Sequence, residues 1–557
     1  MAYYSIHAYD ADVWIRAFRG LNQVDASLNS DPSYAVEVEN VETKNGVLQP
    51  QAGIDVMDGP VKEDCPRVET LAKFHRRWYT GDGSHDWYVC CAGGKFYQKQ
   101  AGNDEADWHE IPLPQFTDEE QEAFKSSVWS WVTYEIAPEV GENTVDVLIM
   151  SNAKDGMIMI EPPDKPTTWG DIKALTDNTW GDLEDGYIWG IPQDETVHGV
   201  MSPKWTIDFV DTRTDPTDDE EPQKKFAVIE RWNERLWGTG VPDEPDTLYY
   251  SKAYAPEDWT TDSEIPENSA GEIRQPTWDG DKFYALKRFG DQLLAFKKNR
   301  VWRIMGVSPD QFDLHEQYGR GTEFFNTIAV EGERCFMATR DALEVYDGMN
   351  TTPYGKEQIE ELWRKANVNA FDQMCAVMFD RRYYLAFPTE GSTVNNAMLV
   401  YNLEERTILY YPDLYIEAFL PTDDILYATS SSLPGKILRL NYDSWFTGKT
   451  TGKPTKWMTP WMDFGYKTIQ KGGYEIYFTP EVKGSPMTFR FSIQTEKKIK
   501  TKIVTVQTTT FKAKQKRIRF GGTGRRFRLI IETGSAPADT AWRLLGGIQM
   551  VVETDPD

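Results

Sequence analysis

Short runs of apolar residues recur along the chain, separated by tight polar turns. In each unit an apolar strand leads into a turn and then into a second apolar strand, which is the pattern of an antiparallel hairpin. The clearest turns are Asn233-Glu234, Gly290-Asp291, Gly332-Glu333, Asp380-Arg381 and Asp423-Asp424. Their first residues are 57, 42, 48 and 43 positions apart, and weaker copies of the unit begin near His85, Glu142 and Asp185.

Repeats of this length with four strands each are typical of the blades of a β-propeller. One blade cannot bury both of its faces, whereas a closed ring of blades hides them and leaves few open strand edges. We therefore predict an all-β fold whose body is a β-propeller-like ring of about seven or eight blades. A stacked array of β-sandwiches is the alternative that the pattern leaves open.

Helical patterns are few. The segment KEQIEELWRK, residues 356–365, places Ile359, Leu362 and Trp363 on one face at helical spacing. Residues 118–124 form a second, weaker candidate that is also compatible with an acidic loop. Both segments are short, so we interpret them as insertions in a β framework.

The composition changes near Lys453. The segment TTGKPT, residues 450–455, resembles a linker, and strongly alternating strands such as MTFRFSI and RIRF follow it. About seven such strands predict a small C-terminal antiparallel β-sandwich. We therefore divide the chain into an N-terminal strand segment that joins the propeller (1–55), a propeller body (56–452) and the sandwich (453–557).

Charge is divided unevenly between these parts. The whole chain carries 60 basic and 88 acidic side chains, a net charge of −28. Residues 453–557 contain 19 basic and 9 acidic side chains, a net charge of +10, which leaves −38 for residues 1–452. Charge of this kind bears on solubility and association rather than on fold. It is compatible with a basic end that docks on a negatively charged surface.

The basic side chains of the last segment gather on its later strands, and we take them as the candidate interaction residues. They are Lys497, Lys498, Lys500, Lys502, Lys512, Lys514, Lys516, Arg525, Arg526 and Arg528. Alternation along a strand places Lys512, Lys514 and Lys516 on one face. Three interpretations stay open: docking against an acidic neighbour such as the body of an adjacent subunit, contact with DNA phosphates, or a solvated face.

No pattern in the sequence indicates catalysis. The six histidines and five cysteines (Cys65, Cys90, Cys91, Cys335 and Cys375) form no metal-binding or redox motif, and no nucleophile elbow is present. We therefore predict no catalytic residue, no cofactor and no metal site. The N-terminus has no basic and apolar leader, and no long apolar run predicts a membrane span.

Three segments together resemble the tail nozzle, or tail hub, proteins of short-tailed phages, the group that includes packaged-DNA stabilisation proteins and tail tubular protein B. The first is AFRGLNQVDASLNSDPSYAVEVENVETKNGVLQPQAGI, residues 17–54. The second is RLWGTGVPDEPDTLYYSKAYAPEDW, residues 235–259. The third is RFGDQLLAFKKNRVWRIMGVSPDQF, residues 288–312, and a strand ending in VYDG at Gly348 follows it. These motifs are structural, not catalytic.

The resemblance implies a non-enzymatic virion protein that is assembled in the host cytoplasm. It implies a homo-oligomeric ring, a hexamer, between the portal and adaptor on one side and tail fibres or a needle on the other. That ring would retain packaged double-stranded DNA and conduct it during ejection without reading its sequence. An acidic lumen would suit this task, because carboxylates repel phosphates whereas basic groups gain affinity through counterion release.

Two other functions are weighed against this one. A propeller that binds or hydrolyses glycans needs paired carboxylates and aromatic platforms, and Asp86-Trp87, Asp107-Trp108 and Asp258-Trp259 are the candidate pairs. We favour the interpretation that these tryptophans pack between blades. The other function is that of a tail-tip component of a long-tailed phage.

Overall fold

The computed structural model describes residues 9–24, 31–60, 66–77, 84–101, 107–114, 122–136, 145–161, 187–188, 191–192, 205–218, 220–262, 264–440, 452–507, 514–537 and 540–554. Nearly all regular structure in these ranges is antiparallel β-sheet, so the prediction of an all-β protein is confirmed. The helices are short: η2 (Pro309–Gln311), η3 (Phe325–Thr327), η4 (Glu357–Ile359), α2 (Glu360–Arg364) and η5 (Val368–Gln373). None of the described helices is long and apolar enough to span a membrane.

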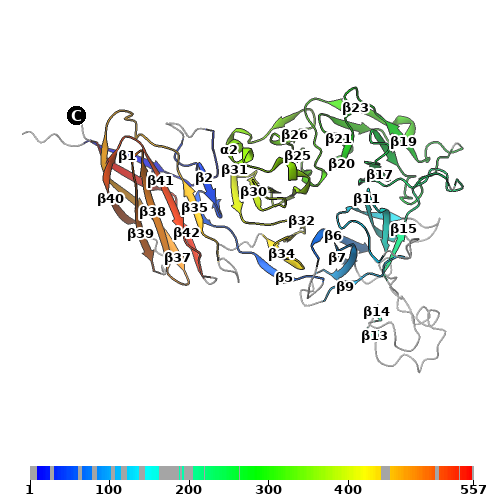
Figure 1. Cartoon of the computed structure of the whole chain (residues 1–557), viewed down its shortest axis with the longest axis horizontal. Helices are drawn as coiled ribbons and strands as arrows, with labels where there is room; N and C mark the ends of the chain where they lie inside the picture. Colours follow the sequence, from blue (N-terminus) through cyan, green and yellow to red (C-terminus); the bar gives the residue numbers. More distant parts are fainter. Residues whose placement is uncertain are drawn as a thin grey trace, which may run out of the picture.

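Seven four-stranded antiparallel sheets, here called blades 1 to 7, follow one another around a propeller-like ring (Figure 1). Blade 1 contains β6 (Val68–Arg77), β7 (Ser84–Ala92), β8 (Lys95–Gln100) and β9 (His109–Glu110). Blade 2 contains β10 (Ser130–Ile136), β11 (Val145–Asn152), β12 (Gly156–Glu161) and β15 (Thr206–Phe209). Blade 3 contains β16 (Val228–Trp232), β17 (Arg235–Thr239), β18 (Thr247–Tyr250) and β19 (Gly271–Arg274). Blade 4 contains β20 (Phe283–Phe289), β21 (Gln292–Lys297), β22 (Val301–Met305) and β23 (Asp313–Gln317).

The remaining blades complete the ring. Blade 5 contains β24 (Ala329–Glu331), β25 (Arg334–Ala338), β26 (Leu343–Tyr346) and β27 (Thr351–Pro353). Blade 6 contains β28 (Cys375–Phe379), β29 (Arg382–Phe387), β30 (Ala397–Asn402) and β31 (Thr407–Pro412). Blade 7 contains β32 (Ala418–Pro421), β33 (Leu426–Thr429), β34 (Lys436–Leu440) and β5 (Asp55–Asp58).

Blade 7 closes the ring with strands from both ends of the body. Strand β5 pairs with β34, where Val56 lies opposite Leu438 and Asp58 opposite Lys436. The first strand of blade 7, β32, contacts the first strands of blades 6 and 1. Closure by an N-terminal strand ties the two ends of the ring together and covers the edge of β34.

The predicted hairpin turns lie where the sequence places them, between the first and second strands of blades 3 to 7. Asn233 and Glu234 both adopt positive φ, as do Asp380 and Arg381, which is the conformation of tight hairpin turns. The copies near His85 and Glu142 correspond to blades 1 and 2, but the copy near Asp185 corresponds only to the short strands β13 (Tyr187–Ile188) and β14 (Ile191–Pro192). The described residues therefore contain seven blades.

The predicted helix at 356–365 is present as η4 and α2. It lies between blades 5 and 6, and its apolar face is buried through Ile359 and Trp363. Most of the second candidate, residues 118–124, lies outside the described residues.

Three further sheets form a C-terminal unit beside the ring (Figure 1). The first contains β1 (Tyr9–Ile15), β43 (Ile548–Thr554), β36 (Lys471–Phe478) and β40 (Lys516–Gly524). The second contains β2 (Glu37–Glu39), β35 (Thr455–Met458), β41 (Phe527–Thr533), β38 (Met487–Thr495) and β39 (Ile499–Val506). The third contains β3 (Val41–Lys44), β4 (Val47–Pro50), β42 (Ala541–Leu544) and β37 (Pro480–Lys483). Aromatic rings pack between the sheets. The ring centroids of Phe478 and Phe491 are 4.4 Å apart, and those of Phe489 and Trp542 are 5.4 Å apart.

The expected role of the first 55 residues was wrong in part. Three of the first four strands pair with C-terminal strands, β1 with β43, β2 with β35, and β4 with β42, and β3 pairs with β4. Only β5 joins the ring. The physical reason is that the apolar side chains of these strands, such as the fully buried Ile15 and Val41, complete the core of the C-terminal unit. Sequence alternation shows that a strand has a buried face but not which sheet covers it.

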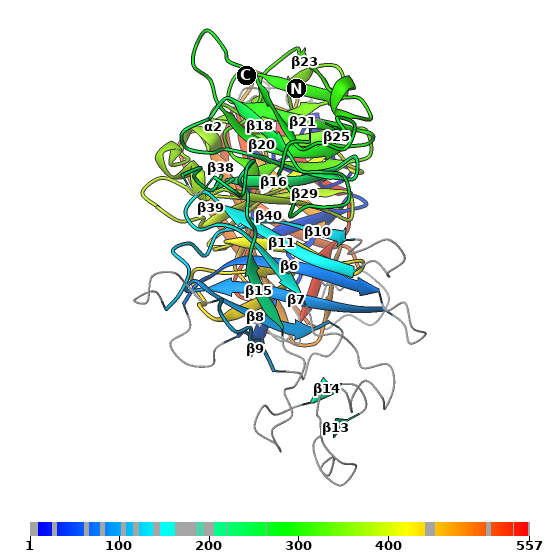
Figure 2. The same ribbon diagram turned by 90° about the vertical axis from the view of Figure 1, so that its right-hand side faces the viewer.

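The ring and the C-terminal unit share one continuous core, and polar contacts reinforce their junction. The backbone N–H of Leu21 donates to the carbonyl of Ile408 in blade 6 over 2.6 Å. Gly20 permits this approach, because a Cβ there would lie 2.2 Å from the Ile408 carbonyl oxygen. Arg382 of blade 6 forms a 2.7 Å ion pair with Glu42 of β3, and both side chains are largely buried. Figure 2 shows the ring in front of the C-terminal unit.

Candidate functional site

Strands β39 and β40 lie on the side of the C-terminal unit that faces away from the ring (Figure 1), and most of the described basic residues lie on or next to these two strands. Strand β39 is the last strand of its five-stranded sheet and pairs with β38. Lys500 lies opposite Ile493, and Lys502 lies opposite Phe491. Because opposite residues share a face and those two partners are buried, Lys500 and Lys502 point to the inner face of the sheet.

These lysines cover the open side of the C-terminal unit. A Cβ added to Gly522 of β40 would lie 3.3 Å from Cε of Lys500, so this glycine leaves room for the lysine stem. Lys516, the first residue of β40, lies opposite the buried Phe478 and is half-buried. The aliphatic stems therefore cover the core between β39 and β40 while the ammonium groups reach water.

The other predicted residues divide between two ends of these strands. Lys497 and Lys498 precede β39, and Arg525 and Arg526 follow β40; all four are exposed. The two turns are neighbours, because the backbone N–H of Arg525 donates to Oε2 of Glu496 over 3.3 Å. Lys514 is exposed just before β40. Lys512 lies outside the described residues.

Arg528 has a structural environment. Its Nε donates to Oε1 of Gln494 over 2.7 Å, and its guanidinium lies 4.8 Å from the ring centroid of Trp461. Burial lowers the pKa of Arg528, and the carboxylate of Glu37 opposes that effect. We therefore assign Arg528 to the sheet rather than to a docking surface.

Basic residues on the two edge strands differ in pairing. Arg517 and Arg519 of β40 both pair with Glu475. Within the described part of the chain, no acidic side chain forms an ion pair with Lys500 or Lys502. The positive charge on β39 is therefore uncompensated within the described chain.

Sequence reasoning missed two apolar residues on the same strand. Ile499 and Ile503 are 58% and 63% exposed, and they lie on the outer face because they alternate with Lys500 and Lys502. The signal is present in the sequence KIKTKIVT, where lysine alternates with isoleucine or threonine. That alternation predicts a strand but does not tell which of its faces is inside.

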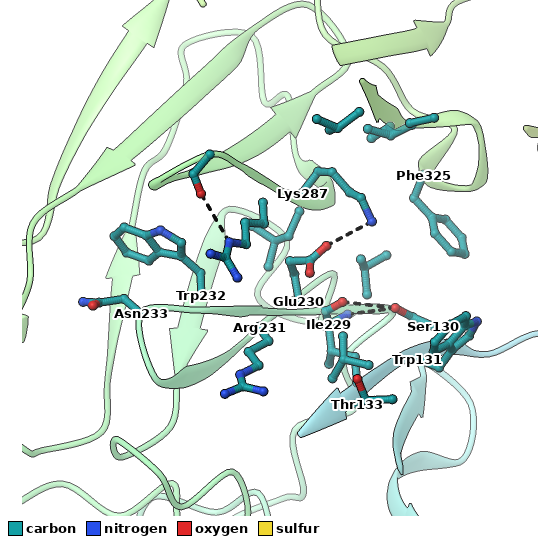
Figure 3. A pocket seen from close by; sticks show the side chains of 18 of the residues that line it. Ser130, Trp131, Thr133, Ile229, Glu230, Arg231, Trp232, Asn233, Lys287 and Phe325 are labelled. Atoms are coloured by element: carbon teal, nitrogen blue, oxygen red, sulfur yellow. Dashed lines mark hydrogen bonds and ion pairs between the residues drawn. The ribbon is translucent and has the colours of Figure 1, made fainter. Parts of the chain in front are cut away.

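A cavity with a volume of about 990 Å³ lies within the ring. Residues of β10, β16, β20, β24 and β28, all first strands of blades, line it. Lys287 Nζ lies 3.2 Å from Oε2 of Glu230 at the cavity, and Figure 3 shows Phe325 to the right of this pair and Trp232 to its left. The attraction of Glu230 raises the pKa of Lys287.

The charges on the wall of this cavity balance. Three acidic and three basic side chains line it: Glu230, Glu234, Asp291, Arg231, Lys287 and Arg288. The volume is in the range of a small-molecule site. This cavity is therefore neither acidic nor a passage for duplex DNA, and the acidic lumen expected of an assembly stays a prediction.

Two of the three carboxylate and tryptophan pairs weighed for a glycosidase, Asp86-Trp87 and Asp258-Trp259, are engaged within the fold. Asp86 accepts from His75 over 2.5 Å and from Lys73 over 2.8 Å. Trp87 is buried and packs 5.2 Å from Trp205, between blades 1 and 2. These contacts match the preferred interpretation that the tryptophan packs between blades.

The third pair is engaged in the same way. Trp259 is buried and lies 4.8 Å from the ring of Phe226. Asp258 forms a 2.8 Å ion pair with Lys252 and accepts from Thr260. Neither carboxylate lines the central cavity.

Among the described residues, no group of three or more histidine, cysteine or acidic side chains is placed to hold a metal ion. Cys90, Cys91, Cys335 and Cys375 are buried. Burial raises the pKa of Cys91 and of Cys335 to about 12, which keeps these thiols protonated and unreactive. Cys65 lies outside the described residues.

No family model matches the chain, and no curated protein matches it. Among solved structures, PorZ, a surface component of the type-IX secretion system of Porphyromonas gingivalis, matches with a TM-score of 0.31 and 10% identity, over 73% of this chain and 42% of that one. BBS1N in complex with ARL6DN matches with a TM-score of 0.28 and 11% identity, over 77% and 98%. An exo-β-1,3-galactanase from Phanerochaete chrysosporium matches with a TM-score of 0.23 and 8% identity, over 62% and 99%. Similarities this low carry no argument about function.

Proposed function

We propose that this protein is a structural component of a phage tail that forms the nozzle or hub ring, retains packaged DNA and conducts it during ejection. The proposal starts from the three segments that resemble tail nozzle proteins. Residues 17–54 include β2 to β4 and the junction with blade 6, residues 235–259 include β17 and β18, and residues 288–312 include β21 and β22. Motifs at these positions build the architecture, as a structural family would require.

The observation that carries the proposal is the uneven distribution of charge between the two ends of the molecule. The basic strands β39 and β40 lie at one end of the molecule, and the ring lies at the other (Figure 1). The ring belongs to residues 1–452, which carry the excess of acidic side chains. Opposite charges at opposite ends favour head-to-tail contacts between copies over symmetric contacts between like surfaces. Head-to-tail contacts close into rings when the rotation between neighbours permits it.

In such a ring the acidic excess would suit a conduit. Carboxylates facing the lumen repel phosphates, so DNA slides without the counterion release that would hold it on a basic wall. The portal and adaptor, tail fibres or a needle, and double-stranded DNA are the proposed partners. Neither a cofactor nor a catalytic step is part of this function.

Electron microscopy and native mass spectrometry of the purified protein test the proposal, together with a search for the chain in virions. We expect a ring of identical subunits, six by the family resemblance, that weakens as salt is raised because surface charge contacts are screened. A strictly monomeric protein that is absent from virions would overturn the assignment. Rings found in a long-tailed virion would move the protein to the tail tip instead.

A second candidate, a glycan-binding protein, has one observation in its favour. The central cavity has the volume of a ligand site, with the half-buried Trp131 and the Glu230–Lys287 pair on its wall. A glycan array separates the two functions: saturable binding that is lost in Glu230→Gln would favour this candidate.

A further inference from the structure

Among the outward-facing edge strands that the structure describes, the two longest lie in the C-terminal unit. Strands β39 and β40 have 8 and 9 residues. The outer strands of the seven blades have between 2 residues, in β9, and 6 residues, in β31. Because an edge strand presents unpaired N–H and C=O groups, a long edge is a template for another strand.

Of these two edge strands, β40 has features that prevent pairing with a further strand. Its register with β36 shifts between Gly472 and Tyr474, opposite a strand segment that contains Gly521 and Gly522. Bulges and glycines of this kind twist an edge away from a partner. The arginines of β40 are also paired with Glu475.

Strand β39 has none of these features. Its pairing with β38 runs without a register shift from Gln494↔Ile499 to Met487↔Val506, and its sequence IKTKIVTV contains neither proline nor glycine. Ile499 and Ile503 are more than half exposed on one face. Only the lysines on the other face guard the edge.

The charge of those lysines decides which partner the edge accepts. A second β39 strand laid against the first would bring the lysines of two copies together, and like charges opposite one another are destabilising. An acidic strand would instead pair its carboxylates with Lys500 and Lys502, while its alternate apolar side chains would cover Ile499 and Ile503.

We propose that the edge of β39, with which no described strand pairs, binds an extended acidic segment of a neighbouring protein chain by strand addition, with Lys500 and Lys502 selecting the partner. The backbone of β39 supplies the affinity, and the two lysines supply the specificity against self-pairing. The inference deepens the tail proposal, on which it rests for the existence of a neighbouring chain, by naming the kind of segment that docks there.

A direct test measures fluorescence anisotropy of a labelled peptide, in which glutamate and valine alternate, against the full-length protein. We expect saturable binding that weakens as salt is raised. The Lys500→Gln/Lys502→Gln variant should bind about tenfold more weakly. The matched variant Lys365→Gln/Lys467→Gln, which removes two exposed lysines elsewhere, should bind like the parent.

Two further probes separate strand addition from simple charge attraction. N-methylation of alternate peptide residues removes the donors along one peptide edge, so we expect one of the two methylated isomers to lose binding. Equal binding by both isomers and the parent would overturn the proposal. Stronger, equally lysine-dependent binding of a DNA duplex would also overturn it in favour of phosphate contact.

A failure of the edge-binding proposal can be distinguished from a failure of the tail assignment. If the protein binds the peptide but is absent from virions, the tail assignment is overturned and the binding site on β39 is supported. If the protein forms rings in virions but does not bind the peptide, the tail assignment is supported and the binding site on β39 is overturned.

Discussion

The ring and the C-terminal unit of this protein manage strand edges in different ways. In the ring, seven sheets cover one another's faces, β5 closes the circle, and the outer strands are short. In the C-terminal unit, two sheets end in long strands on the same side, and lysine stems cover the opening. A closed architecture needs no charged guard, whereas an open one relies on side-chain chemistry to choose what may pair with it.

The same contrast applies to charged groups. In the ring, buried charges such as Arg235 and Lys297 donate to backbone carbonyls and hold loops in place. On β39 the lysines are exposed and have no acidic partner among the described residues. Charge is therefore structural in the first region and available for binding in the second.

The largest effect is expected where the two regions meet. Arg382→Met would leave Glu42 buried without its partner, and breaking a buried pair in this way costs about 3–5 kcal/mol of unfolding free energy. Burial alone would lower the pKa of Arg382, but Glu42 raises it above its ordinary value. Urea unfolding of the variant measures the loss.

The double variant Arg382→Met/Glu42→Met is the control for this junction. Because it removes both charges, it should recover most of the lost stability. If the double variant is no more stable than Arg382→Met, loss of the ion pair does not explain the loss of unfolding free energy.

A smaller effect, dependent on pH, is expected in the ring. Glu417 precedes β32, its Oε2 has no hydrogen-bond partner among the described residues, and Nη1 of Arg67 lies 3.3 Å from its Oε1. Burial raises the pKa of Glu417 from 4.5 to about 7, Arg67 opposes the shift and Glu69 adds to it. The folded chain therefore holds this proton to higher pH than the unfolded chain, and the resulting stability is lost as the pH rises through about 7.

Glu417→Gln tests this, because the amide resembles the protonated acid. At pH 5 the variant and the parent should unfold at similar temperatures, whereas well above the raised pKa the variant should be more stable by about 2 kcal/mol. The exposed Glu390→Gln is the control and should leave the pH profile unchanged. A parent whose stability does not fall between pH 5 and pH 8 would contradict the assignment to Glu417.

Much of the ring could be predicted from the sequence because its turns are local. Asn233-Glu234 and Asp380-Arg381 are recognisable as tight turns, and their spacing gives the repeat. The partners of β5 and β1 could not be predicted, because they lie far away in the chain. Alternation marks a buried face without naming the sheet that covers it.

The candidate site was predictable in composition but not in geometry. The basic residues were visible as a group, yet the roles of Arg528 and Lys500 differ because one stacks on Trp461 and the other lies over Gly522. Ile499 and Ile503 were missed because an isoleucine in an alternating strand is normally placed inside. On an edge strand whose lysines point inward, that assignment is reversed.

The smallest effect separates the edge from the interior of the same sheet. Ile503→Thr should change the unfolding free energy by no more than about 0.5 kcal/mol, because the side chain is 63% exposed. On the adjacent strand β38, Ile493 is 1% exposed, and Ile493→Ala should cost about 2–4 kcal/mol through the cavity it leaves. Denaturant unfolding of both variants measures the difference. A large loss in Ile503→Thr would mean that the outer face of β39 is already covered within the chain, and the edge would then not be free to bind another strand.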